Sequence, residues 1–140
     1  MNKSHKELVR LYYEELWNAK NKEYIDYLFT DDIEFHGSLN IDTSGKKMFE
    51  NYMNTILNAI PNLHHSIETI ICDEDNIAVK AIYNGTHTGK LFDFEPTNNR
   101  IKYYGASFFK FENEKIKSIW VLGDLTNLNK QLSKKRDNDE

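Results

Sequence analysis

A carboxylate stands where an apolar segment gives way to a polar one near the end of the chain. The stretch SIWVLGDLTNL, residues 118–128, predicts a strand followed by a short helix, with Asp124 at the junction. Asp124 shares a period-two phase with Ile116 and Trp120, so it faces the helices if Trp120 does. A poorly solvated carboxylate in that place would hold and exchange a proton near neutral pH. Aspartate is also a favoured helix N-cap, and the sequence leaves both roles open.

Two histidines lie at the ends of predicted strands. His87, in YNGTHTG, shares the phase of Tyr83, and an inward imidazole would donate to a substrate oxygen or relay a proton. Taken alone, His87 is better explained as a hydrogen-bonded histidine at a strand end. His36, in IEFHG, ends a shorter strand beside a glycine and is expected to line a wall at most.

Metal and nucleophile chemistry find little support. His64 and His65 are adjacent on a strand and therefore point to opposite faces, and no cysteine or carboxylate stands at ligand spacing from them. Cys72 is the only cysteine, which excludes an internal disulfide, and there is no GxSxG motif. The 6 glycines are scattered singly, so no phosphate-binding loop is predicted.

The bulk composition describes one globular domain. A chain of 140 residues with 39% hydrophobic residues is long enough to bury a substantial core. The formal charge is -4, and lysine and arginine do not cluster before the last few residues, so nucleic acid is not an expected partner. No apolar run is long enough to span a membrane, and MNKSHKELVR lacks the apolar core of a signal peptide. We therefore expect a cytoplasmic protein.

Hydrophobic periodicity predicts the elements that must position these side chains. Apolar residues recur at helical spacing and then at strand spacing, with turn residues between the segments. The predicted helices cover residues 5–19, 22–29, 46–60 and 125–132, and the predicted strands cover 33–37, 63–72, 77–89, 100–112 and 116–124. Residues 38–45 are predicted as a loop, residues 1–132 as one domain and residues 133–140 as a charged tail. Consecutive strands joined by short turns predict an α+β fold with an antiparallel sheet and helices on one face.

The phase of two strands predicts which side chains enter the core. Leu63, Ile67 and Ile71 alternate along the first long strand and are expected on one side. The second long strand has one phase that contains Ile77, Val79, Ala81, Tyr83 and His87. Trp17, Tyr12 and Tyr13 on the first helix are candidates for the wall of an aromatic pocket. Plain core packing is the better explanation for at least two of these three residues.

Three segments carry a resemblance to a known family. The stretches AIPNLHHSIETII, NGTHTGKLFDFEPTNNRI and EKIKSIWVLGDLTNLNKQL resemble the SnoaL-like polyketide cyclase (ester cyclase) family, and the helix ending YYEELWN is similar to it as well. The family's C-terminal signature is matched by Lys115, Ile116, Trp120, Asp124, Leu128, Gln131 and Leu132. The resemblance covers most of residues 5–132.

The resemblance implies both a fold and a chemistry. It implies a cone-shaped fold of the nuclear-transport-factor-2 type, with the helices on the concave face of a curved sheet and a homodimer formed through that sheet. In the family, the aspartate matching Asp124 is the acid/base of an aldol ring closure that needs no metal or organic cofactor. His87 would then help to position the substrate. The substrate-binding residues implied for a small hydrophobic ligand are Trp17, His36, Tyr83, Phe108 and Trp120.

The sequence departs from the family pattern in places that concern the substrate. Asn98 replaces the glycine of a PTG-like turn, and asparagine tolerates the positive φ that such a turn requires. Glu114 and Ser118 also differ from the usual residues. Two hypotheses remain: an acid/base cyclase or isomerase acting on a hydrophobic carbonyl compound, and a non-catalytic protein that binds a small ligand in the same cavity. An epoxide hydrolase is less consistent with the sequence, because it needs an arginine between pocket carboxylates.

Overall fold

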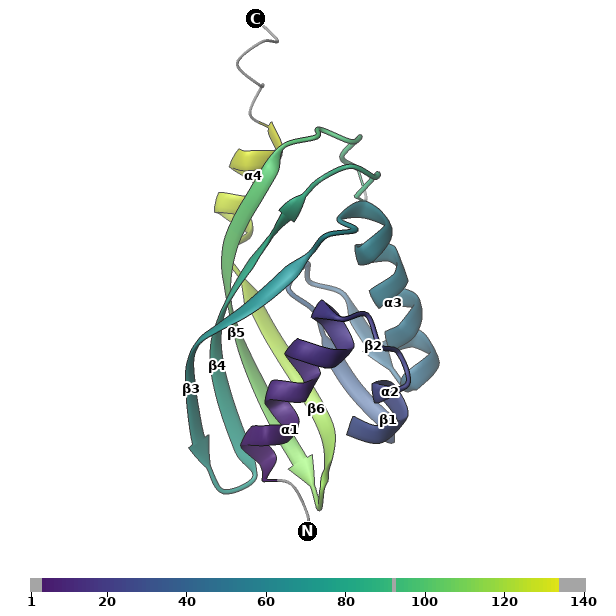
Figure 1. Ribbon diagram of the computed structural model, residues 1–140, viewed down its shortest axis with the longest axis vertical. Coiled ribbons are helices and arrows are strands. Elements are labelled where there is room, and N and C mark those ends of the chain that lie inside the picture. Colours follow the sequence, from purple (N-terminus) through teal and green to yellow (C-terminus); the bar gives the residue numbers. More distant parts are fainter. Residues whose placement is uncertain (1–3, 92, 134–140) are drawn as a thin grey trace, which may run out of the picture.

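The computed structural model describes residues 4–91 and 93–133, which form one curved sheet with helices packed against it (Figure 1). The strands of this part of the chain follow the order β2-β1-β6-β5-β4-β3. The α+β class predicted from the sequence is confirmed. The strands are β1 (Phe29–His36), β2 (Asp42–Ser44), β3 (His64–Asp73), β4 (Asn76–Thr86), β5 (Arg100–Glu112) and β6 (Lys115–Gly123). The helices are α1 (His5–Leu11), η1 (Tyr12–Asn18), α2 (Tyr24–Leu28), α3 (Lys46–Ala59) and α4 (Leu125–Ser133).

The first predicted helix consists of an α-helix that continues as a π-helix. Ser4 and Glu7 form a capping box at the start of α1. From Tyr12 the chain continues as the π-helix η1, whose wider turn is uncommon and often occurs at functional sites. In η1 the side chains of Tyr12, Tyr13, Leu16 and Trp17 are all buried. Three aromatic side chains thereby face the sheet from this short helix.

The sheet confirms the predicted meander and adds an edge to it. Strands β3 to β6 pair antiparallel in chain order, as the short turns predicted. Strand β1 joins them by pairing parallel to β6, and it begins at Phe29, where the sequence predicted the last residue of a helix. The short strand β2 lies inside the predicted loop and pairs with β1. The core lies between the helices and the inner, concave face of the sheet (Figure 1).

A bulge in β6 corrects the predicted orientation of its side chains. The pairing of β6 with β5 shifts by one residue at Lys117. Ile116 before the bulge and Ile119 and Val121 after it all face the core. Trp120 consequently faces the opposite side of the sheet and is 46% exposed, so its predicted inward phase is wrong.

A second bulge corrects β3 in the same way. The register of β3 against β4 shifts between Ile67 and Thr69. Ile70 then packs against the core, whereas Ile71, predicted to face inward, is exposed. One additional residue reverses the alternation of everything that follows it.

Two further observations limit the kinds of site that need discussion. No helix in the described ranges is long and apolar enough to cross a membrane. Within the same ranges, no three histidine, cysteine, aspartate or glutamate side chains are placed to hold a metal ion. Residues 134–140 of the predicted tail lie outside the described residues, and Ser133 is the last residue of α4.

Candidate functional site

An inner cavity lies between η1, α3 and the concave face of the sheet. Its volume is about 40 Å³. That volume holds a few water molecules, since one water needs roughly 10–15 Å³ on the same measure. None of the described residues that line it is Asp, Glu, Lys or Arg. The polar side chains of the lining are Tyr12, Tyr13, Trp17, Ser38, Tyr52, His65, Tyr83, Tyr103 and Ser107.

The tyrosines of this lining are neutral hydrogen-bonding groups. Burial raises the pKa of Tyr12 and Tyr13 well above the ordinary value, and it raises that of Tyr83 to about 12. Burial likewise raises the pKa of Tyr52 and Tyr103, with Ser38 opposing the shift in both. The phenols therefore keep their protons at neutral pH and can donate hydrogen bonds inside the cavity.

His65 is the titratable imidazole of the cavity. Its ring lies among Trp17, Tyr83 and Tyr13, with centroid distances of 5.0, 4.8 and 5.7 Å. Burial, assisted by the neighbouring His64, lowers its pKa to about 3, so the ring is neutral at physiological pH. The prediction that His64 and His65 point to opposite faces is confirmed, because His64 is exposed.

Asn18, the last residue of η1, fixes the backbone of His65. Its Nδ2 donates to the His65 carbonyl oxygen at 2.8 Å, and its Oδ1 accepts from the His65 N–H at 2.7 Å. This two-point contact attaches the end of the π-helix to β3. The ring of His65 is consequently held against Trp17, which lies on the same helix.

Three polar atoms of the lining are buried without a hydrogen-bond partner. They are Oη of Tyr13, Nε1 of Trp17 and Nδ1 of His65. Two of these groups have a polar neighbour that acts on a tyrosine, because the Trp17 indole lowers the pKa of Tyr12 and the Ser107 hydroxyl lowers that of Tyr13, although burial outweighs both contacts. An unpartnered buried polar group costs roughly 1–3 kcal/mol. A ligand or water that supplied acceptors would recover part of that cost.

A tight turn closes one side of the cavity. The N–H of Gly37 donates to the carbonyl of Ile41 at 2.9 Å, which closes the turn that carries Ser38 and Leu39. The Ser38 hydroxyl lies 3.1 Å from the Tyr103 phenol, so the turn is fastened to β5. Both Ser38 and Leu39 line the cavity, and the turn is therefore part of its rim.

Asp124 lies next to this rim and caps α4. Its Oδ1 accepts from the N–H of Asn127 at 3.2 Å, and the carboxylate is exposed. The structure thus supports the N-cap alternative, and the expectation of a poorly solvated Asp124 on the inner face is wrong. The preceding residue, Gly123, packs against Ser38 and Tyr103 of the rim. Asp124 therefore lies outside the described lining of the cavity, on the solvent side.

His87 is buried outside the cavity, in the segment that follows β4. Its Nδ1 lies 3.0 Å from the Thr97 hydroxyl and accepts from the Thr97 N–H at 3.3 Å, while burial lowers its pKa. Asn98 adopts φ 58°, the positive value that the PTN turn was predicted to need. Gly89 packs against Asn58 at the end of α3, where a Cβ would clash with the backbone. His87 thus organises a loop, as the simpler interpretation of the sequence held.

An outer groove of about 530 Å³ lies on the opposite, convex face of the sheet. It receives three residues that were predicted for the inner pocket: His36, Phe108 and Trp120. Phe108 is 48% exposed because the alternation of β5 turns Phe109 inward instead. The prediction that Phe108 and Trp120 line a pocket under the helices is wrong for this reason.

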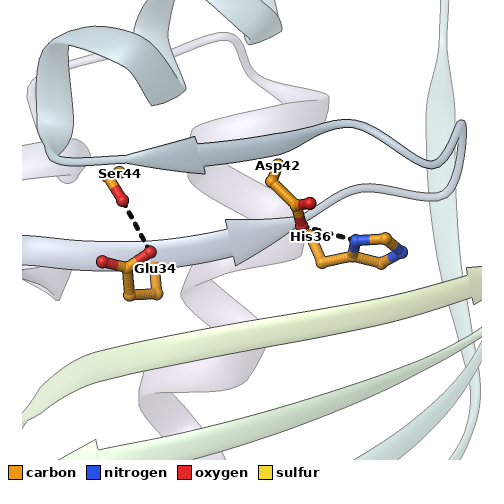
Figure 2. Close-up of polar contacts among 4 residues, drawn as sticks. All are labelled: Glu34, His36, Asp42 and Ser44. Atoms are coloured by element: carbon orange, nitrogen blue, oxygen red, sulfur yellow. Dashed lines mark hydrogen bonds and ion pairs between the residues drawn. The ribbon is translucent and has the colours of Figure 1, made fainter.

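His36 forms a polar pair at the edge of the outer groove (Figure 2). Its Nδ1 lies 2.6 Å from Oδ1 of Asp42, and its ring stacks on Trp120 with 5.5 Å between the centroids. On the same pair of strands, the hydroxyl of Ser44 donates to Glu34 at 2.7 Å. Both contacts join β1 to β2, that is, the strand predicted over residues 33–37 to the segment 38–45 predicted as a loop.

Of the predicted site residues, the structure places Trp17 and Tyr83 together in the inner cavity. Sequence reasoning missed His65, which it considered only as a metal ligand. A signal was present, because His65 shares the inward phase of Leu63 before the bulge of β3. The rim tyrosines Tyr52 and Tyr103 carried no comparable signal, since buried tyrosines usually pack in the core.

A comparison with family models decides the affiliation. The model described as SnoaL-like polyketide cyclase matches residues 7–132. The chain belongs to the SnoaL-like polyketide cyclase family. The family resemblance stated from the sequence is confirmed. No curated protein matches this SnoaL-like chain.

Solved structures confirm the fold expected for this SnoaL-like chain. A candidate SnoaL-like polyketide cyclase from Jannaschia sp. CCS1 is 16% identical, with a TM-score of 0.87 over 97% of this chain and 99% of that one. A candidate polyketide cyclase from Bacillus cereus ATCC 10987 is 20% identical, with a TM-score of 0.73 over 92% and 80%. A hypothetical protein with a ketosteroid isomerase-like fold from Catenulispora acidiphila, in complex with trimethylamine, is 18% identical. Its TM-score is 0.77 over 89% of this chain and 91% of that one. The fold is thus that of the nuclear-transport-factor-2 type.

Proposed function

We propose that this protein binds a small uncharged carbonyl compound in the inner cavity and transforms it by acid–base chemistry of the ring-closure or isomerisation type. The observation that carries the proposal is the lining itself. The described residues around the cavity include aromatic and apolar side chains, neutral tyrosines and a neutral His65, and no ionised group. Burial of an ionised ligand without a counter-charge is costly, so the cavity favours a neutral one.

Asp124 supplies the acid/base in this proposal. It follows Gly123, which packs against the rim, and its cap uses the oxygen Oδ1. The carboxylate removes a proton from the carbon next to a ligand carbonyl, and the electron pair moves to the carbonyl oxygen. The enolate carbon then forms a bond to a second carbonyl carbon of the same ligand, and the first carbonyl group forms again. The electron pair of the second C=O double bond moves to its oxygen, and this alkoxide takes the proton back from Asp124. General acid–base catalysis of this kind contributes about 10²–10⁴-fold to a rate.

A non-catalytic ligand-binding protein is the second candidate. It is favoured by one observation, namely that the Asp124 carboxylate is already engaged as a helix cap and is exposed. The cavity itself then serves for binding alone, because the described lining holds no base stronger than an imidazole whose pKa is about 3.

Hydrogen exchange of a ketone separates the two candidates. The protein is incubated with cyclopentanone in D₂O, and loss of the hydrogens next to the carbonyl is followed by ¹H NMR. The catalytic proposal expects exchange above the protein-free rate, its loss in Asp124→Asn and its retention in Glu114→Gln. Asparagine caps a helix about as well as aspartate, so the fold is kept, and Glu114 is an exposed turn residue that serves as the matched control. Binding without exchange would instead support the second candidate.

The partner best suited to the outer face of the sheet is a second copy of the chain. Tyr104, Phe108, Trp120 and Leu122 form an exposed apolar strip along β5 and β6, on adjacent strands that pair Phe108 with Trp120. Such strips on a protein surface commonly mark an interface.

Charged side chains of both signs line the groove beside this strip. Glu34 and Asp42 line it from β1 and β2, Lys110 from β5 and Asp73 from β3. A two-fold axis parallel to the strands would turn β1 of one copy toward β5 of the other, and we propose that Glu34 and Lys110 then pair between the copies. We expect a dimer of wild-type protein in sedimentation velocity and a monomer of Trp120→Glu. Lys110→Glu should weaken the dimer, and adding Glu34→Lys should restore it; a monomeric wild-type protein would contradict the homodimer.

A further inference from the structure

The unpartnered groups of the inner cavity differ in what they can bind. Trp17 Nε1–H can only donate a hydrogen bond, whereas the Tyr13 hydroxyl and a neutral imidazole can donate or accept. The cavity therefore contains one obligatory donor and two adaptable groups with no partner among the described residues. A ligand atom that satisfies the Trp17 indole must be an acceptor, and the two adaptable groups can donate to the same ligand.

These groups belong to one rigid unit. Trp17 and Tyr13 lie on η1, and His65 is attached to the same helix by the two hydrogen bonds of Asn18. Trp17 is also packed against Phe49 of α3, with ring centroids 6.0 Å apart. Donors held in this way lose little conformational entropy when a ligand binds.

We infer that Trp17, Tyr13 and His65 recognise the ligand through one of its oxygens, an acceptor such as a ketone oxygen, and select against isosteric ligands without that oxygen. The inference rests on the proposed function, because it assigns the ligand to the inner cavity. It goes beyond it by naming the residues that determine specificity. The same donors would hold the negative charge of an enolate oxygen, since hydrogen bonds to a charged acceptor are roughly twice as strong as neutral ones.

The chain allows a direct spectroscopic test. It contains 2 tryptophans, so a ¹⁵N-labelled sample shows two indole N–H resonances, and Trp120→Phe identifies that of Trp17. The probes are cyclopentanone and methylenecyclopentane, which have the same shape and differ in the oxygen. We expect the Trp17 resonance to move downfield with cyclopentanone and not with methylenecyclopentane, because only the ketone accepts the indole hydrogen.

A second variant measures the contribution of Tyr13. We expect Tyr13→Phe to raise the Kd for cyclopentanone about tenfold, which corresponds to the loss of one hydrogen bond. The Kd for methylenecyclopentane should stay unchanged. Without ligand, Tyr13→Phe should be at least as stable to urea as wild type, since an unpartnered hydroxyl is removed; this measurement also shows that the variant folds.

The outcomes separate the inference from the proposed function. If wild-type protein binds both probes equally and the Trp17 resonance responds to both alike, the inference is overturned while the inner cavity remains the ligand site. The same holds if Tyr13→Phe weakens both probes to the same extent. If neither probe perturbs any cavity resonance, the proposed function fails, and the inference fails with it.

Discussion

The two faces of one sheet carry hollows of opposite character. On the concave face, the inner cavity is small, uncharged and lined by side chains that are almost completely buried. Tyr12 and Tyr13 are examples, and both rings pack against Phe109. On the convex face, the outer groove is about thirteen times larger by volume, 530 against 40 Å³, and combines half-exposed aromatic rings with Glu34, Asp42 and Lys110. Both are built from the same strands, often from consecutive residues.

The contrast separates two tasks that a single pattern of aromatic residues could not distinguish. A closed, neutral hollow with unpartnered polar atoms suits a small molecule that supplies the missing hydrogen-bond partner. An open groove with exposed rings and charges of both signs suits a protein surface. The following substitutions test how different the two faces are, beginning with the largest expected effect.

Phe108 and Phe109 are neighbours in the sequence and lie on opposite faces, with exposures of 48% and 1%. We expect Phe109→Ala to lower the free energy of unfolding by about 3–5 kcal/mol, the usual cost of removing a buried phenylalanine. Phe108→Ala should cost less than about 1 kcal/mol in dilute protein, measured by urea unfolding. A larger loss for Phe108→Ala that grows with protein concentration would show that a second copy covers the outer face.

His65 makes the stability of the inner side dependent on pH. Its folded pKa is about 3 and its unfolded pKa about 6.5, so between these values the unfolded chain binds more protons and stability falls as the pH falls. From pH 7 to pH 5 we expect a loss of about 2 kcal/mol from this residue. Urea unfolding of His65→Gln at both pH values should lack that part of the loss, while His87 contributes equally to both proteins. An identical pH dependence in the variant would mean that the ring is not buried in the neutral form.

Asp124 lies between β6 and α4, and the expected effect of replacing it is smaller. Asp124→Ala should cost about 1 kcal/mol because the cap of α4 is lost, and Asp124→Asn should cost almost nothing. Thermal and urea unfolding of both variants against wild type measure this difference. Variants that are both as stable as wild type would show that the cap contributes little and would strengthen the catalytic proposal for the carboxylate.

The sequence predicted the elements better than it predicted the faces. Amphipathic spacing identified the helices from Leu8 to Trp17 and from Phe49 to Ile56, and Pro61 correctly limited the second one. The phase of β4 was also predicted correctly, because that strand has no bulge before Tyr83. A regular alternation is all that a single sequence offers, and it holds only while the pairing register is unbroken.

The site residues differ in how well the sequence pattern placed them. Tyr83 lies in the inner cavity because β4 pairs with β5 without a bulge, whereas Trp17 lies there on a π-helix that the helical spacing did not indicate. Trp120 was misplaced by one bulged residue, Lys117, whose position depends on pairing with a strand distant in the sequence. The partnerless state of the Trp17 indole was beyond sequence reasoning altogether, since it depends on which groups the packed fold leaves without a neighbour.

The turn that carries Ser38 has a consequence for the speed of binding. A cavity of about 40 Å³ admits a molecule larger than a few waters only if part of its lining moves, and the turn fastened by the contact between Ser38 and Tyr103 is one such part. If this turn opens to admit a ligand, the apparent Kd is the intrinsic Kd divided by the fraction of molecules whose turn is open. The observed association rate then levels off with rising ligand concentration at the rate of opening, and Ser38→Ala should raise that limit.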